Sequence, residues 1–181
     1  MRRPVLALIL LVLLAPWSPT SAQEGQVRRW FEEINRDIWR PFMEGVQKDD
    51  ESLYLRVRSK DYVRVQANGP LILTYADYVD DTVAMMRRYR EQGVRLTIDV
   101  RFEERIIDGA SASEKGISRV LFVARDGEMR TYYARFHTIS RKEGETWRVL
   151  TEYFSSRAKN SAVRSFATQR RWTTSPTSAA I

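Results

Sequence analysis

The spacing of apolar residues changes along the chain, from helical in the first half to strictly alternating in the second. Near the start, apolar residues recur every three or four positions, which predicts a helix with a broad apolar face; they are Phe31, Ile34, Ile38 and Phe42. Pro41 lies inside this pattern and lacks an amide donor, so we expect a kink or a restart there.

Three further elements are predicted before the alternating region begins. The acidic residues 49–51 indicate the start of a short second helix, where negative charge suits the helix dipole. Residues 61–66 alternate as a strand that stops at Asn68-Gly69-Pro70. Thr74 or Asp77 is then expected to cap a third helix that ends at Gly93.

The second half of the chain predicts strand after strand. The expected strands are residues 94–102, 117–125, 131–141 and 146–154. Asp126-Gly127 and Glu143-Gly144 provide two-residue turns between the later strands. Helices first and an antiparallel meander afterwards predict an α+β fold, with N-terminal helices packed on one face of a strongly curved antiparallel sheet.

Composition divides the chain into three parts. Residues 1–22 combine Arg2-Arg3, an uncharged apolar run and small residues up to Ala22, which predicts a signal peptide cleaved before Gln23. The alternative, a retained membrane anchor, requires about 20 apolar residues, and this run is shorter. Residues 23–156 form one domain, and residues 157–181 a basic tail that we expect to be disordered. We therefore expect a secreted protein, most naturally periplasmic, without an integral membrane segment after cleavage.

The positive charge is not carried by the domain itself. The chain has 30 Lys and Arg against 23 Asp and Glu, a formal charge of +7. Two of the bases lie in residues 1–22 and five in the tail, so residues 23–156 hold 23 of each sign. Because nucleic-acid-binding domains concentrate positive charge on the folded body, we expect no nucleic-acid partner.

Metal and cofactor chemistry is not indicated by the residue types. The chain has no cysteine and one histidine, which excludes disulfides, thiolate metal sites and a histidine-rich metal centre. A glycine-rich phosphate loop and a nucleophile elbow are also missing from the sequence. The expectation is no metal and no cofactor.

Three local strings resemble the nuclear transport factor 2-like superfamily, also described as SnoaL-like or cystatin-like α+β. The strings are residues 38–42 (IWRPF) followed by Asp49-Asp50, residues 60–65 (KDYVRV), and the ending formed by residues 135–137, 141–144 and 147–150. The resemblance covers residues 26–156. It implies a cone-shaped pocket between the helices and the concave sheet face, in relatives as different as isomerases, dehydratases, cyclases and transport factors, so the fold alone selects no function.

The expected turns define which residues would share the pocket. With Glu143-Gly144 as a two-residue turn, Arg135 stands opposite Glu152 and His137 opposite Leu150, on a face shared with Tyr133. With Asp126-Gly127 as the other turn, Val120 pairs with Tyr133 and Ser118 with Arg135. The candidate ligand contacts on this face are therefore Tyr133, Arg135, His137 and Glu152. Asp99 of the first long strand joins them, and Tyr78 is added because its segment would cover the mouth of the pocket that the resemblance implies. In the competing interpretation, Arg135 and Glu152 form a cross-strand pair on an exposed or dimer-forming face.

Three functions stay open from the sequence. The leading hypothesis is a domain that binds a small apolar or amphipathic molecule in its cavity. The second is a cofactor-free isomerase, dehydratase or cyclase that uses Glu152 or Asp99 with His137 and Tyr133. The third is a structural homodimer or adaptor whose cavity is filled by its own aromatic side chains.

Overall fold

The computed structural model describes residues 21–67, 71–155 and 166. The expected signal peptide and basic tail lie outside these residues, apart from residues 21 and 22 and Phe166. Export and the disorder of the tail therefore remain predictions.

The first helix of the pattern is continuous but changes its hydrogen bonding. α1 (Ser21–Ile34) passes into a π-helical segment η1 (Asn35–Trp39) and then into α2 (Arg40–Lys48). The π-helical segment directly precedes the first turn of α2, where Pro41 removes a backbone donor. The helix thus runs on through Pro41, and the change is a widened turn that ends directly before α2.

The other two helices begin at the predicted residues, and α4 also ends at its predicted glycine. α3 (Glu51–Arg56) starts after Asp50, whose carboxylate accepts from the amides of Ser52 and Leu53. α4 (Tyr75–Gln92) starts with a capping box between Thr74 and Asp77. It ends at Gly93, whose φ of 68° lies in the left-handed region that favours glycine.

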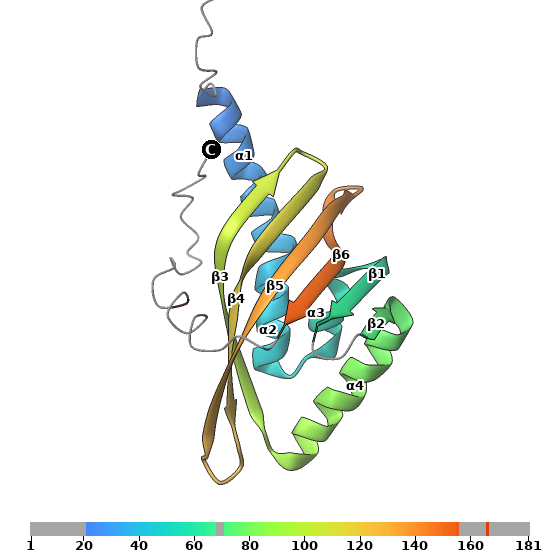
Figure 1. The fold of residues 1–181 in the computed structure, drawn as a ribbon, viewed down its shortest axis with the longest axis vertical. Helices are drawn as coiled ribbons and strands as arrows, with labels where there is room; N and C mark the ends of the chain where they lie inside the picture. Colours follow the sequence, from blue (N-terminus) through green and yellow to red (C-terminus); the bar gives the residue numbers. More distant parts are fainter. Residues whose placement is uncertain (1–20, 68–70, 156–165, 167–181) are drawn as a thin grey trace, which may run out of the picture.

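Six strands form one mostly antiparallel sheet. They are β1 (Arg58–Gln66), β2 (Leu71–Thr74), β3 (Arg95–Ile107), β4 (Ser111–Val123), β5 (Met129–Glu143) and β6 (Thr146–Ser155). Their order is β2-β1-β6-β5-β4-β3, and the β1–β6 pair is parallel. In Figure 1 the helices α1 to α3 cross behind the curved sheet, while α4 and the β4–β5 hairpin both reach the lower end of the molecule. The predicted α+β class is confirmed; β2 was not predicted.

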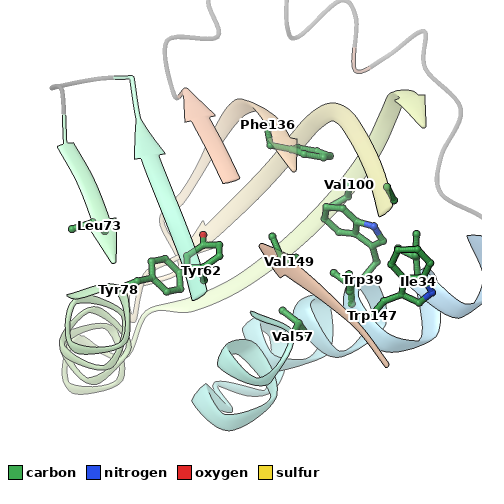
Figure 2. Close-up of a cluster of buried hydrophobic side chains, with 12 residues drawn as sticks. Ile34, Trp39, Val57, Tyr62, Leu73, Tyr78, Val100, Phe136, Trp147 and Val149 are labelled. Carbon is green, nitrogen blue, oxygen red and sulfur yellow. The ribbon is translucent and has the colours of Figure 1, made fainter. Parts of the chain in front are cut away.

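The main core lies between the helices and the concave sheet face. Trp39 packs against Phe102 and Phe136 with ring centroids 5.0 and 5.3 Å away. Figure 2 shows this cluster, which reaches from Ile34 and Trp39 to Tyr62 of β1 and Tyr78 of α4. The middle of the concave face is therefore filled by side chains of the protein itself.

The predicted β5–β6 pairing is wrong. Glu143 pairs with Thr146, so the turn residues are Gly144 and Glu145, and the register shifts once more between Val149 and Thr151. Moving a two-residue turn by one position keeps each residue on its face, but a one-residue bulge reverses the face of everything beyond it. Consequently, Arg135 pairs with Ser155 and His137 with Tyr153, while Glu152 pairs with Thr138.

The β4–β5 pairing also differs from the prediction by one residue. The backbone amide of Ala124 donates to the carbonyl of Glu128, 2.9 Å away, which leaves three residues in the loop. Val120 accordingly pairs with Tyr132 and Ser118 with Ala134. The predicted pairs of Val120 with Tyr133 and of Ser118 with Arg135 are wrong because the turn around Asp126-Gly127 holds one residue more than expected.

Candidate functional site

These registers divide the six candidate residues between the two faces of the sheet. Glu152 shares the helix-covered face with its partner Thr138, and Tyr78 of α4 is buried against the same side. The other four lie on strands with side chains on the outer face, and each has a partner there; they are Tyr133, Arg135, His137 and Asp99. The predicted set therefore does not come together as one site.

On the outer face, the contacts are pairwise. Asp99 accepts from Arg119 at 2.8 Å, and Arg135 forms an ion pair with Glu103. His137 Nε2 lies 2.9 Å from the hydroxyl of Ser113.

Tyr133 packs against Phe166, with ring centroids 5.5 Å apart, beside buried Ile117. This contact brings the carboxy-terminal Phe166 onto the outer face of the sheet.

On the inner face, Glu152 belongs to a buried polar cluster contributed by β1 and β6. The hydroxyl of Tyr62 donates to Glu152 Oε2 at 2.6 Å, and Arg58 Nη2 lies 3.9 Å from the same oxygen. Arg64 is the direct β1 partner of Glu152 in the parallel ladder. One carboxylate is thus shared by two arginines that are 94 and 88 residues away in sequence.

Aromatic rings enclose both guanidinium groups. The Arg58 guanidinium carbon lies 4.6 Å from the ring centres of Tyr54 and Tyr78, whose hydroxyls are hydrogen-bonded to each other at 2.8 Å. The Arg64 guanidinium carbon lies 4.6 Å from the ring centre of Phe154 and 5.3 Å from that of Tyr78. Such stacking orients a guanidinium without neutralising it.

The buried cluster has a net charge of +1 at neutral pH. Burial alone would raise the pKa of Glu152, but the charges of Arg64 and Arg58 and the Tyr62 hydrogen bond outweigh it and lower the pKa. Burial raises the pKa of Tyr62 and Tyr78, which therefore stay neutral. Two guanidinium groups and one carboxylate remain charged at neutral pH.

A cleft of about 600 Å³ opens next to this cluster. It lies between the carboxyl half of α4 and the β4–β5 hairpin. Its lining is mostly aromatic and aliphatic: Tyr89, Val94, Val120, Phe122, Ala124, Glu128, Arg130, Tyr132, Tyr133, Ala134 and Phe154. Phe154 is shared by both regions, since it lines the cleft and stacks on Arg64. Tyr133 is the predicted contact that reaches this lining.

A second buried carboxylate, Glu114, has a different environment. It is 0% exposed, and Arg105 pairs with its Oε1 at 2.6 Å. Trp39 Nε1 donates to Oε2 at 3.0 Å, and Arg105 also donates to the Asn35 side chain at 2.8 Å. This cluster joins β3 and β4 to the π-helical segment.

Within residues 21–67, 71–155 and 166, no group of three His, Cys, Asp or Glu side chains is arranged to hold a metal ion. Across this described part of the chain, no helix has the length and apolar character to cross a membrane.

Sequence reasoning identified Glu152 and Tyr78 but missed Arg58 and Arg64. The signal available was the alternation of Tyr62 and Arg64 in the predicted strand, which puts a ring and a charge on one face. It could not be used without the β1–β6 pairing, which joins the two ends of the domain.

The comparisons with known proteins give structural likeness only. Neither a protein-family model nor a curated protein matches the chain. Among solved structures, a nuclear transport factor 2-like protein with a cystatin-like fold from Novosphingobium aromaticivorans is 13% identical, with a TM-score of 0.62, over 81% of this chain and 96% of that one. A conserved protein from Planctomyces limnophilus is 15% identical (TM-score 0.57; 72% and 94%), and a ketosteroid isomerase-like protein from Erwinia carotovora atroseptica is 11% identical (0.53; 70% and 98%). At these identities the likeness establishes the architecture, and the chain has the nuclear transport factor 2-like, cystatin-like fold.

Proposed function

We propose that this protein binds a small apolar or amphipathic molecule in the cleft between α4 and the β4–β5 hairpin. The observation that carries the proposal is the cleft of about 600 Å³ with its aromatic lining. This volume is within the range of about 300–1,000 Å³ that is usual for small-molecule sites. It also favours ligand binding over an adaptor with a completely filled cavity.

The lining supports an apolar or amphipathic occupant. Tyr89, Phe122 and Tyr132 form a series of edge-to-face contacts, with ring centroids 5.7 and 5.1 Å apart. Tyr132 is nevertheless 53% exposed, a large amount for an aromatic side chain that has two rings beside it. A molecule in the cleft would cover apolar surface that now faces water.

The acid–base alternative finds no support in the residues first considered for it. Glu152 lies on the opposite sheet face from Asp99 and His137, so these side chains have no common substrate position. The lowered pKa of Glu152 also makes it a weak proton acceptor at neutral pH.

Export is part of the proposal and rests on the pattern of residues 1–22. Expression of the full chain in a bacterial host, followed by amino-terminal sequencing of the periplasmic product, should give a chain that starts at Gln23. A product that retains Met1 in the cytoplasm would contradict export without affecting the binding proposal.

Binding is tested with the neutral fluorescent probe N-phenyl-1-naphthylamine on the mature chain, after native mass spectrometry has confirmed that no molecule co-purifies. We expect saturable binding, weakened roughly three- to tenfold by Tyr132→Ala because an aromatic contact is lost. Tyr153→Ala is the matched control: Tyr153 is 46% exposed, but it lies on the outer face beside His137. Absence of saturable binding, or equal effects of the two substitutions, would overturn the proposal.

A further inference from the structure

We infer that the molecule bound in the cleft carries one anionic group, a carboxylate or a similar oxyanion, and that Arg64 binds this group. The inference rests on the proposed function, because it concerns the buried cluster that meets the same cleft at Phe154. It adds the chemical class of the ligand and the residue that selects it.

The first support is the charge balance of the buried cluster. Arg58 and Arg64 stand against Glu152 alone, so the cluster has an excess of one positive charge. A buried charge without a counter-ion is strongly unfavourable, and buried charges in proteins are normally paired. One further negative charge would balance the cluster.

The second support is a pair of unused donors. The Nε atoms of Arg58 and Arg64 are buried and have no hydrogen-bond partner among the described residues. Such donors are rare in folded proteins, because each costs the free energy of losing its water. Two of them, on arginines that both pack against Tyr78, leave places where another molecule can supply acceptors.

The third support comes from comparison with the Glu114 cluster. There one carboxylate meets one arginine, and both carboxylate oxygens and the guanidinium have partners. The same sheet thus contains a buried ion pair whose charges cancel. The surplus at Arg64 is a particular property of its site rather than a general feature of this core.

The two arginines have different roles. Arg58 is only 6% exposed, donates to the carbonyl of Tyr54 and approaches Glu152 to 3.9 Å. The charge of Arg64 also lowers the pKa of Glu152, but it acts from a greater distance. No described residue lies within salt-bridge distance of Arg64, which is stacked on Phe154.

Phe154 also lines the cleft, so the Arg64 charge is one ring away from the open space. Arg64 itself does not line the cleft, so the anionic end of an amphipathic molecule reaches it past the edge of the Phe154 ring, while the apolar part covers the aromatic lining.

The test uses 6-phenylhexanoate and its neutral analogue 6-phenylhexanamide as competitors of N-phenyl-1-naphthylamine. On the wild-type protein we expect the carboxylate to compete roughly ten- to a hundredfold better than the amide, because hydrogen bonds to charged groups are the strong ones. In Arg64→Met this preference should disappear while the affinity for the neutral probe stays. Arg64→Lys should retain part of the preference, because it keeps the charge.

Each outcome separates the two levels of the hypothesis. If the neutral probe binds but the carboxylate and the amide compete equally, or neither competes, the anionic-ligand inference is overturned and the cleft proposal stands. A preference that survives in Arg64→Met would assign it to another residue and also overturn the inference. Failure of the neutral probe itself would overturn the proposed function. Circular dichroism of both variants verifies that they are folded.

Discussion

Glu114 and Glu152 both point from the sheet toward the helices, and both meet arginine, but their surroundings differ. Glu114 has one arginine, a tryptophan donor and an asparagine linked through that arginine. Glu152 has two arginines, with two donor nitrogens left over, beside a cleft. Closed ion pairs hold a structure in place, whereas an incomplete one leaves interaction energy available for a ligand. The difference therefore separates a structural cluster from a binding cluster in the same core.

The largest expected change in stability comes from removing the arginine that pairs with Glu114. Arg105→Met should lower the free energy of unfolding by about 3–5 kcal/mol, because it leaves the Glu114 carboxylate buried without a counter-charge. Urea denaturation monitored by tryptophan fluorescence measures the loss.

Arg135→Met is the matched control for Arg105→Met. It breaks a half-exposed pair with Glu103 on the outer face and should cost less than about 1 kcal/mol. Similar losses in the two variants would show that the Glu114 cluster has no special structural role.

A smaller effect, dependent on pH, should come from Glu152→Gln. The folded protein lowers the pKa of Glu152, so this carboxylate contributes stability above its unfolded pKa of about 4.3. That contribution is lost as the pH falls below this value through the folded pKa. The variant should therefore be less stable than the wild type at pH 7, and the difference should shrink as the pH falls through the folded pKa.

Urea denaturation at pH 7, 5, 4 and 3 measures the convergence. Because all other carboxylates are common to both proteins, the difference between the curves reports Glu152 alone. A difference that does not change with pH would mean that the lost stability comes from packing and not from the charge.

Elements whose signals are local could be predicted from the sequence. The caps at Asp50, Thr74 and Gly93 define helix ends through bonds within three residues, and the structure has them as expected. Five of the six described strands were also readable, because alternation is a property of each strand alone, whereas the four-residue β2 is too short to show it. Which side chains of neighbouring strands share a face could not be predicted, because this depends on the exact number of residues in each turn.

One bulge was enough to divide the predicted site. The register shift after Val149 put Glu152 on the face opposite to Tyr133, while the three-residue loop after Ala124 changed only which β4 residues lie beside Tyr133. Neither has a clear sequence signal, since Asp126-Gly127 fits a two-residue turn as well as a three-residue loop. Arg58 and Arg64 were missed because their partner Glu152 joins them through a parallel pair between the first and last strands of the domain.

The smallest expected change in stability, and the sharpest test of the comparison, is Arg64→Met. In the ligand-free protein it removes the surplus charge and a buried donor without a partner, while methionine keeps much of the packing against Phe154. We expect the free energy of unfolding to stay the same or to rise by up to about 1 kcal/mol, measured by the same urea denaturation as Arg105→Met. A loss of several kcal/mol, equal to that of Arg105→Met, would mean that Arg64 completes a structural ion pair with Glu152. If Arg64 serves ligand binding, Arg64→Met should leave the stability unchanged or raise it and should also abolish the preference for the carboxylate. Both results together would mean that the folded chain alone does not require the charge of Arg64.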